Sequence, residues 1–214
     1  MSHYFKYKAL RVALLEGLLS VSDSVREKAD RSMPPSTRKP PSIITNLVYK
    51  AKLNCDVDLH HLASHLVNVR YQPGTFVGLI WHHRKIDKGC LLFRNGSIII
   101  SGCFSHEQAV VCIRRYARIL QKRFQYDVRI SHINLVTCSL LSDVGMQLDL
   151  DLIAVCYPNA TYEPEIHNAC FIKKGNICLS CFSSGQVVTT GIKKLNLINE
   201  VVTPILTDLT LFSI

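Results

Sequence analysis

The chain has 214 residues, of which 48% are hydrophobic and 19% are charged. This composition supplies enough apolar surface for a buried core in one or two domains, and it excludes a globally disordered protein. Lysine and arginine outnumber aspartate and glutamate by 25 to 16, which gives a formal net charge of +9. A positive balance of this size favours a polyanionic partner.

The nine cysteines are odd in number, and their spacing along the chain forms no compact framework. We therefore expect a reducing compartment and no disulfide-bonded scaffold. No apolar run approaches the ~18–20 residues of a membrane-spanning helix, so no membrane partner is expected. The first apolar run, at 12–21, is interrupted by Glu16 and Gly17. No small-residue cleavage site follows it, which argues against a signal peptide.

The chain begins with a predicted helix and a predicted linker. Residues 1–31 carry leucine and valine at three- and four-residue spacing with charged residues between them, which predicts an amphipathic helix. This helix either packs on the protein itself or docks on a partner. Residues 32–42 contain four of the eight prolines. They form a predicted linker, because proline disrupts both helix interiors and sheet ladders.

Beyond the linker the sequence repeats itself. Three landmarks recur in the same order 88 to 91 residues later: Asn46-Leu-Val48 as Asn134-Leu-Val136, Tyr71-x-Pro73 as Tyr162-x-Pro164, and Phe93-x-x-Gly96 as Phe182-x-x-Gly185. Landmarks that recur in order with such small slips indicate an internal duplication. The sequence therefore predicts two tandem repeats, at 43–125 and 126–214.

Each repeat is predicted to contain a long first strand, further strands and a closing helix, with a short helix after the first strand. The elements expected in the first repeat lie at 43–53, 59–67, 76–83, 89–93, 97–101 and 107–124. The strands expected in the second lie at 129–140, 169–173, 177–182 and 186–190. Helices on one face of such an antiparallel sheet leave the opposite face uncovered.

The predicted strands are apolar on both faces, as in Ile98-Ile-Ile100 and Leu91-Leu-Phe93. An uncovered apolar sheet face needs a partner. That partner could be a second sheet, a lipid, a protein, or the minor groove of a nucleic acid, which apolar side chains can enter.

Charge is divided unequally between the two repeats. Residues 41–125 hold 12 basic and 4 acidic side chains, whereas residues 126–214 hold 5 and 8. A DNA-binding surface made by both repeats would hold phosphates strongly in its first half and weakly in its second.

The duplicated pattern resembles the TATA-box-binding protein family. The most specific matches are the segment 114–122, the segment Tyr162-Glu-Pro-Glu165 and the paired Asn-Leu-Val segments. The resemblance covers residues 42–214 and implies an α+β fold. In that fold two tandem TATA-binding-protein-like repeats form a saddle, a curved antiparallel sheet with helices on its convex face. The resemblance also implies binding to the minor groove of double-stranded promoter DNA, with kinking by inserted side chains.

The resemblance implies a set of DNA-contacting residues on the concave face. One asparagine of each repeat would hydrogen-bond to groove acceptors, and the other residues would press on sugars and bases or offer a hydroxyl. The implied set is Asn46, Val48, Phe76, Leu91, Phe93, Ile99 and Ser101 in the first repeat, and Asn134, Val136, Phe182, Val188 and Thr190 in the second. For the two asparagines, a simple role at a strand end is the alternative.

In the family, a pair of phenylalanines from each repeat is inserted at one end of the bent site. Phe76 and Phe93 match the first pair and lie 17 residues apart. In the second repeat Phe182 is present, but His167 stands in the companion position, 15 residues before it. An imidazole is smaller and more polar than a phenyl ring, so we expect a weakened wedge. This exchange resembles the divergent TATA-binding-protein-like factors, whose TATA recognition is poor or absent.

Two surfaces resemble the protein-binding regions of the family. The stirrup residues Tyr162, Glu163, Pro164, Glu165 and Ile166 resemble the segment that engages transcription factor IIB. The basic helix residues Arg114, Arg115, Arg118 and Lys122 resemble the surface where factor IIA docks. A plain turn and a solvated charged face are the simpler alternatives.

The sequence contains no pattern typical of an enzyme. His61 and His65 have the spacing of two ligands on one helix face, but no third ligand is near them. Cys178 and Cys181 lie three residues apart in a predicted strand, which directs their thiols to opposite faces. Neither clustered carboxylates nor a phosphate-binding glycine loop is present. We expect no catalysis, no metal and no cofactor.

The sequence thus predicts a nuclear, DNA-binding transcription initiation factor that recruits factors IIA and IIB. One alternative is a scaffold of the same fold that binds IIA- and IIB-like partners with little or no TATA recognition. The other is a substrate-binding domain of a nucleic-acid enzyme, and the missing acidic cluster argues against it.

Overall fold

The computed structural model describes residues 40–214. The helix expected at 1–31 and residues 32–39 of the expected linker lie outside these residues. The described residues divide into two compact units, one of residues 44–139 and the other of residues 40–43 together with 140–214. The two sequence repeats are described in turn.

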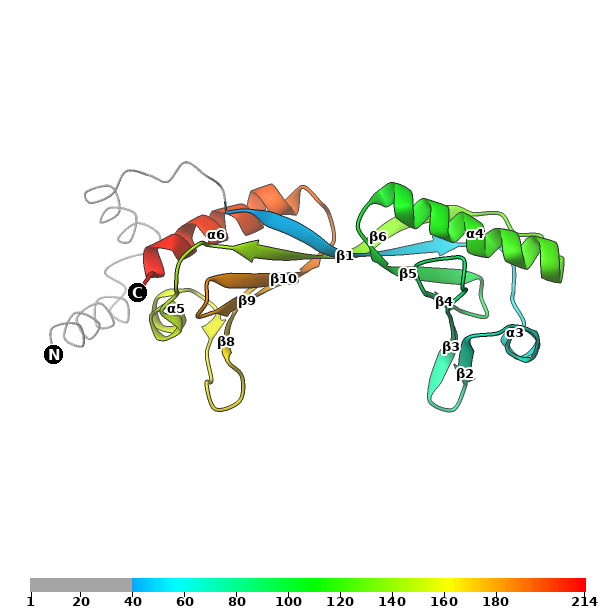
Figure 1. Cartoon of the computed structure of the whole chain (residues 1–214), viewed down its shortest axis with the longest axis horizontal. Helices are drawn as coiled ribbons and strands as arrows, with labels where there is room; N and C mark the ends of the chain where they lie inside the picture. The colour runs from blue at the N-terminus through cyan, green and yellow to red at the C-terminus, as the bar shows by residue number, and fades with distance from the viewer. Residues whose placement is uncertain (1–39) are drawn as a thin grey trace, which may run out of the picture. The chain divides into compact units, whose positions relative to one another are not determined.

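The first repeat is an antiparallel sheet with two helices (Figure 1). Its strands are hydrogen-bonded in the order β2-β3-β4-β5-β1. The long helix α4 packs against β5, and the short helix α3 packs beside β2 and β3. The elements in chain order are β1 (Ser42–Lys52), α3 (Leu59–His65), β2 (Val69–Gln72), β3 (Phe76–Trp81), β4 (Cys90–Leu92), β5 (Ser97–Cys103) and α4 (His106–Phe124).

The second repeat has the same order of elements. Its strands are hydrogen-bonded in the order β6-β10-β9-β8-β7. The elements are β6 (Ser131–Asp143), α5 (Leu150–Cys156), β7 (Ala160–Thr161), β8 (Ala169–Lys174), β9 (Ile177–Phe182) and β10 (Gln186–Ile192), followed by a π-helical turn (Ile198–Val202), α6 (Thr203–Leu209) and a final 3-10 turn (Thr210–Phe212). The predicted α+β fold with two tandem repeats is therefore confirmed.

Local signals explain where α4 begins and ends. The Ser105 side chain accepts a hydrogen bond of 3.1 Å from the backbone N–H of Gln108, which caps the first turn. Gln125 has a left-handed backbone and ends the helix. The buried side of the helix includes Ile113 and Leu120, which are fully enclosed.

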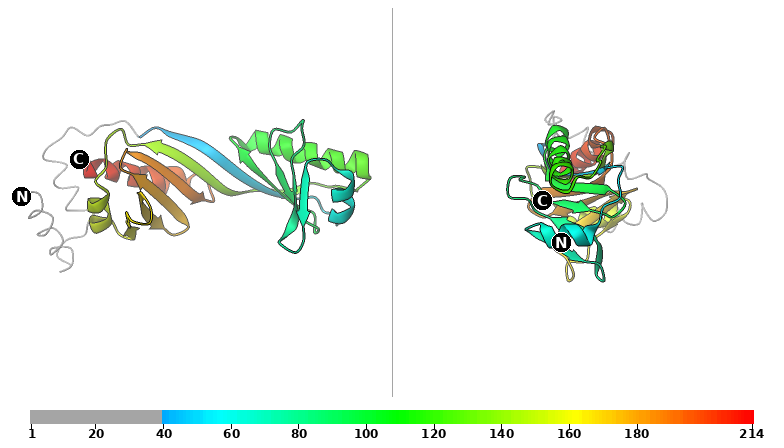
Figure 2. Two further views of the ribbon diagram at one scale, coloured as in Figure 1. Left: turned by 60° about the horizontal axis from the view of Figure 1, so that its bottom comes forward. Right: turned by 90° about the vertical axis from the view of Figure 1, so that its right-hand side faces the viewer.

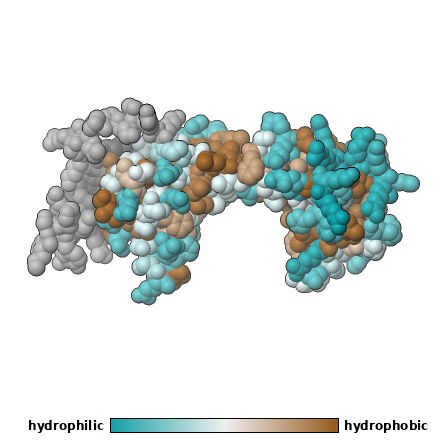
Figure 3. Space-filling model, viewed as in Figure 1, coloured by the Kyte–Doolittle hydropathy of each residue, from teal (hydrophilic) through white to brown (hydrophobic). Residues whose placement is uncertain are grey.

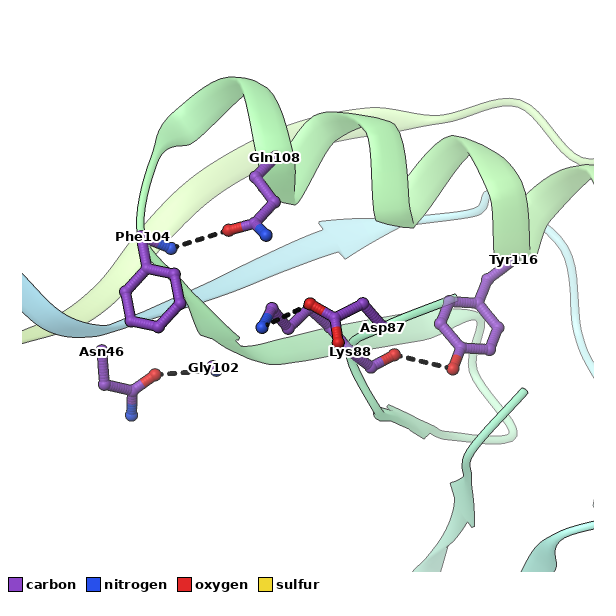
Figure 4. Close-up of polar contacts among 7 residues, drawn as sticks. All are labelled: Asn46, Asp87, Lys88, Gly102, Phe104, Gln108 and Tyr116. Atoms are coloured by element: carbon purple, nitrogen blue, oxygen red, sulfur yellow. Dashed lines mark hydrogen bonds and ion pairs between the residues drawn. The ribbon is translucent and has the colours of Figure 1, made fainter. Parts of the chain in front are cut away.

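Tyr116 ties α4 to the strands beneath it. Its ring packs edge-on against Trp81, with centroids 4.8 Å apart. Its hydroxyl donates a hydrogen bond of 2.8 Å to the carbonyl of Lys88 (Figure 4). It also accepts one of 3.3 Å from the N–H of His83. Tyr116 thereby holds both ends of the connection between β3 and β4.

Equivalent backbone hydrogen bonds relate the two repeats. Leu53 N donates to Gly96 O at 2.8 Å, and Val144 N donates to Gly185 O at 3.0 Å. Gly96 and Gly185 have φ values of 70° and 90°. An added Cβ at either one would collide with the backbone that follows the first strand. The segments that follow the two first strands therefore correspond at a spacing of 91 residues. The hairpins that accept these hydrogen bonds correspond at a spacing of 89 residues.

The structure contains two strands that the sequence did not predict, β2 and β7. The short helix expected after the first strand of the second repeat was predicted without bounds and is α5. The alternation of leucine and aspartate at 148–152 does not have the period of a helix. Asp149 nevertheless accepts a hydrogen bond of 3.0 Å from Leu152 N and caps the first turn of α5. This cap is a local interaction that hydrophobic periodicity does not reveal.

All nine cysteines are free thiols. In β9, Cys181 is buried and Cys178 is half-exposed, so the two thiols lie on opposite faces of the strand as predicted. Over residues 40–214, no helix combines the length and the apolar character required to cross a membrane.

Candidate functional site

Each sheet has a buried face and an uncovered face. In β5, Ile98 and Ile100 are buried and Ile99 is half-exposed, because successive residues of a strand point to opposite sides. Leu91 in β4 and Val188 in β10 are half-exposed in the same way. Figure 2 shows α4 on one side of the strands of the first repeat. We call the side with the half-exposed residues the uncovered face.

Apolar residues form a continuous row across the uncovered face of the first repeat. Ile80 pairs with Leu91, and Leu91 pairs with Ile99, on three adjacent strands. Ser101 is exposed two residues beyond Ile99 and therefore lies on the same face. The sequence reasoning had placed Leu91, Ile99 and Ser101 there together.

The corresponding row of the second repeat is more polar. Phe171 pairs with Ser180, and Ser180 pairs with Val188. Thr190 lies two residues beyond Val188 and is exposed, as Ser101 is in the first repeat. Ser180 thus stands in the centre of the row, where the first repeat has a leucine.

Asn46 has a fixed orientation in β1. Its Oδ1 accepts a hydrogen bond of 2.7 Å from the backbone N–H of Gly102, in the strand-end segment beside it (Figure 4). Asn46 and Val48 are half-buried and alternate with the buried Leu47 and Tyr49, so they belong to the uncovered face. The bond to Gly102 occupies the oxygen of the amide and leaves its NH₂ group as a donor.

Asn134 and Val136 lie in the first half of β6. Both are exposed, and Val136 is 39% exposed although it is apolar. The strand is irregular near its start, where His132 has a φ of 53°. The equivalence of Asn134 with Asn46 stays a prediction.

Thr137 and Ser139 alternate with the buried Cys138 and Leu140 and therefore lie on the uncovered side of β6. They follow Asn46 and Val48 by 91 residues, the spacing that relates Leu53 to Val144. The burial pattern from Leu47 to Ala51 repeats from Cys138 to Ser142 at this same spacing. Sequence reasoning missed this pair, although the two tyrosine-proline landmarks already recur at 91 residues.

Phe76 and Phe93 form an aromatic pair at the edge of the first sheet. Their ring centroids are 6.0 Å apart with an interplanar angle of 70°. Phe76 is 38% exposed, although it is a large apolar residue. Gly78 makes room for the pair, because a Cβ there would lie 2.7 Å from Phe76 Cε1 and 3.0 Å from Phe93 Cε1.

His167 takes the place of Phe76 in the second repeat. Its ring lies 6.4 Å from that of Phe182 and 5.0 Å from that of Phe171. Its Nδ1 accepts a hydrogen bond of 3.1 Å from the backbone N–H of Ala169. Ala169 stands where the first repeat has Gly78, so this pair is built on a different local contact.

The predicted basic surface lies on the outer side of α4. Hydrophilic residues gather over this helix in the right-hand part of Figure 3. Within the described part of the chain, its four predicted partner-binding cations make no ion pair. All of them are exposed, namely Arg114, Arg115, Arg118 and Lys122.

The predicted stirrup is the loop between β7 and β8. The carbonyl of Glu163 accepts hydrogen bonds from Ile166 N at 3.0 Å and from His167 N at 2.9 Å, which closes a turn. Tyr162 is half-buried, and Glu163, Pro164 and Glu165 are exposed. Ile166 is 78% exposed, so the turn presents an apolar side chain beside two carboxylates.

The histidines of α3 form a small aromatic cluster. The His61 and His65 rings lie 4.3 Å apart, and His61 also contacts Phe124. His65 Nδ1 lies 2.8 Å from the carbonyl oxygen of His61. Among residues 40–214 there is no group of three or more His, Cys, Asp or Glu side chains that could hold a metal ion.

Comparison with known proteins identifies what this arrangement resembles. A family model described as "Transcription factor TFIID (or TATA-binding protein, TBP)" matches residues 42–123 and 132–212. The TATA-box-binding protein of Acanthamoeba castellanii is 30% identical over 200 residues, which are 88% of this chain and 74% of that protein. The solved structure of Methanococcus jannaschii TBP aligns with a TM-score of 0.70 at 26% identity, covering 79% of this chain and 98% of that one.

A further relative is longer than this chain. The TATA box-binding protein-like 2 of Rattus norvegicus is 30% identical over 160 residues. These residues are 73% of this chain but 46% of the rat protein, so the match spans about half the length of that relative.

Proposed function

This chain belongs to the TATA-box-binding protein family, and from that premise we propose that it is a nuclear transcription initiation factor that binds promoter DNA in the minor groove. The observation that carries the proposal is the uncovered face of the first repeat. There an oriented amide donor, Asn46, lies among apolar side chains. No catalytic role, cofactor or metal is part of the proposal.

The chemistry of this face suits a minor groove of A·T pairs. Such pairs present only hydrogen-bond acceptors in the minor groove, adenine N3 and thymine O2. The NH₂ group of Asn46 can donate to them because Gly102 already satisfies its oxygen. The apolar row through Leu91 and Ile99 would pack on deoxyribose, which is the least polar part of the groove wall.

Phe76 and Phe93 provide the side chains for kinking DNA. Apolar wedges unstack a base step at a cost of a few kcal/mol, which the wider contact with bent DNA offsets. A phenyl ring that is 38% exposed at a sheet edge is available for this insertion. His167 would unstack the opposite step less effectively.

Two protein partners complete the proposal. The exposed cations of α4 suit an acidic surface, and we assign them to factor IIA or an equivalent. We assign the stirrup to factor IIB or an equivalent, because it presents Ile166 between acidic and aromatic residues. Arg118→Glu would then weaken only the binding of factor IIA. Glu165→Lys would weaken only the binding of factor IIB.

Fluorescence anisotropy with an A·T-rich promoter duplex and a scrambled duplex tests DNA binding, with and without factor IIA. The Phe76→Ala variant should lose at least tenfold in affinity and should reduce DNA bending measured by energy transfer between the duplex ends. Val111→Ala is the matched control, because Val111 is exposed on α4. It should bind DNA as the unmodified protein does.

A protein scaffold is the second candidate function. The observation in its favour is that the DNA-facing side has changed, with His167 and Ser180 in the second repeat, while the basic helix and the stirrup keep exposed, recognisable side chains. Absence of sequence preference in every duplex experiment, together with binding of IIA- or IIB-like partners, would establish the scaffold and exclude the promoter-binding role.

A further inference from the structure

The aromatic pair of the first repeat depends on a residue without a side chain. The rings of Phe76 and Phe93 lie 6.0 Å apart, and Gly78 lies against both of them. A Cβ at Gly78 would come within 2.7 Å of the first ring and 3.0 Å of the second. The two rings therefore use the space that a side chain at this position would fill.

The second repeat fills this space. Ala169 follows His167 by two residues, as Gly78 follows Phe76, and it pairs with Phe182 on the neighbouring strand. A methyl group is thus present where the first repeat leaves room for its rings. The imidazole of His167 lies 6.4 Å from the ring of Phe182 but 5.0 Å from that of Phe171, in β8. Its closer neighbour is therefore a residue of the strand that follows it.

A backbone hydrogen bond determines which nitrogen of His167 is a donor. The N–H of Ala169 donates to Nδ1 at 3.1 Å, so Nδ1 carries no proton. The proton of the neutral ring is then on Nε2. His167 is exposed, and Nε2 forms no hydrogen bond within residues 40–214. The side chain thus presents a single N–H donor whose position in the ring is fixed by Ala169.

Such a donor suits the floor of a minor groove better than the interior of a base stack. Insertion between two bases would bury the Nε2–H without an acceptor, at a desolvation cost that a phenyl ring does not have. In the groove, adenine N3 and thymine O2 are acceptors for it. His167 takes the place of Phe76, so it faces the base pairs at the end of the site that the second repeat covers.

We propose that His167 binds DNA as a hydrogen-bond donor: its Nε2–H contacts adenine N3 or thymine O2, and its ring stays outside the base stack. The inference rests on the proposed function, since it specifies one contact of the same DNA-binding face. It goes beyond a weakened wedge, because it gives His167 a contact of its own. It also makes Ala169 a positioning residue, which acts through the N–H that holds Nδ1.

Duplexes with altered acceptors test the donor by competition anisotropy with the full chain. In one A·T-rich site 3-deazaadenine, which has a C–H group in place of N3, replaces adenine at both ends. In another, 2-thiothymine replaces thymine there and has a weakly accepting sulfur in place of O2. His167→Ala should weaken binding to the unmodified site about fivefold, as expected for one hydrogen bond. On one of the two altered sites it should cost nothing further, because the acceptor is already missing.

His60→Ala is the matched control. His60 is also an exposed histidine, but it lies on α3 and not on the sheet. This variant should bind each duplex as the unmodified protein does. Thermal unfolding of His167→Ala should match that of the unmodified protein, since the side chain is exposed.

A second experiment distinguishes a donor from a wedge. The fluorescence of 2-aminopurine at the end steps of the site rises when its neighbouring base is unstacked, and energy transfer between the duplex ends measures the bend. His167→Ala should change neither signal at saturating protein. His167→Phe should change them little, because the Ala169 methyl group still fills the space. His167→Phe/Ala169→Gly rebuilds the arrangement of the first repeat and should raise both signals, whereas Ala169→Gly alone should not.

The outcomes separate this inference from the proposed function. If no A·T-rich duplex binds better than a random duplex, the proposed function is overturned and the inference with it. If A·T-rich DNA is preferred but His167→Ala costs the same factor on every duplex, the proposed function stands and the inference fails. A loss of 2-aminopurine fluorescence in His167→Ala would show that His167 is a wedge. Coupling of this variant to neutral methylphosphonate linkages, and not to the base analogues, would assign the donor to a phosphate. Either of these two results also overturns the inference alone.

Discussion

The backbone N–H of Gly102 donates a hydrogen bond of 2.7 Å to Oδ1 of Asn46 and so sets which end of the amide faces outward. Asn46→Asp keeps the oxygen that accepts from Gly102, but it replaces the NH₂ donor with a second, negatively charged oxygen. The variant should fold normally and should lose at least tenfold in DNA affinity, about 1.4 kcal/mol. Fluorescence anisotropy and thermal unfolding measure the two properties.

Asn199→Asp provides the control for this change. It adds the same charge to an exposed residue of the π-helical turn Ile198–Val202, outside the strands that form the uncovered face. Its effect on DNA affinity should be small. An equal loss in both variants would mean that net charge, and not the donor at Asn46, determines affinity.

Gly78→Ala should disturb the aromatic pair without unfolding the sheet. The new Cβ would lie 2.7 Å from a ring atom of Phe76, which must move because the opposing Phe93 ring is also within 3.0 Å. We expect DNA affinity and bending to fall at least fivefold, whereas the free energy of unfolding changes by about 1 kcal/mol or less. In the same hairpin, a Cβ at Gly74 meets nothing within 4 Å. Gly74→Ala should therefore bind DNA normally.

Tyr116→Phe should destabilise the first repeat. The substitution leaves Lys88 O and His83 N without the hydroxyl that now pairs with both. An unpaired buried polar group costs about 1–3 kcal/mol, which urea denaturation can measure. Burial also raises the pKa of Tyr116 well above its usual value, so its hydroxyl stays protonated at neutral pH. Tyr71→Phe, at a half-buried tyrosine, should have a smaller effect.

The cysteines should differ sharply in reactivity towards iodoacetamide at pH 8. Burial raises the pKa of Cys103 and Cys170 to about 11 and that of Cys181 to about 12. A thiol with a pKa four units above the pH is ionised to about one part in 10⁴, and the thiolate is the reactive form. Mass spectrometry of the native protein should find the label first on the half-exposed Cys55 and Cys178.

The alkylation experiment has its own control. All nine cysteines are free, so all should react once urea unfolds the chain. Rapid labelling of Cys181 in the native protein would show that β9 opens readily and would contradict its burial.

Much of the fold follows from the sequence because its signals are local. The tandem landmarks predicted two repeats, and strand and helix periodicity placed β9 at its observed bounds and α4 within one residue of them. The family resemblance implied one shared face for Leu91, Ile99 and Val188, and all three are half-exposed. The bounds of α5 escaped prediction because a single cap at Asp149, and not periodicity, starts this helix.

The sequence by itself determined the duplication, the α+β fold, the basic helix and the replacement of a phenylalanine by His167. Only the tertiary structure decided how the segments after the two first strands correspond. The recurring letters suggested a spacing of 88 residues, but the equivalent hydrogen bonds of Leu53 and Val144 give 91. These bonds join segments that are far apart in the sequence, so they depend on how the chain packs and not on which letters recur.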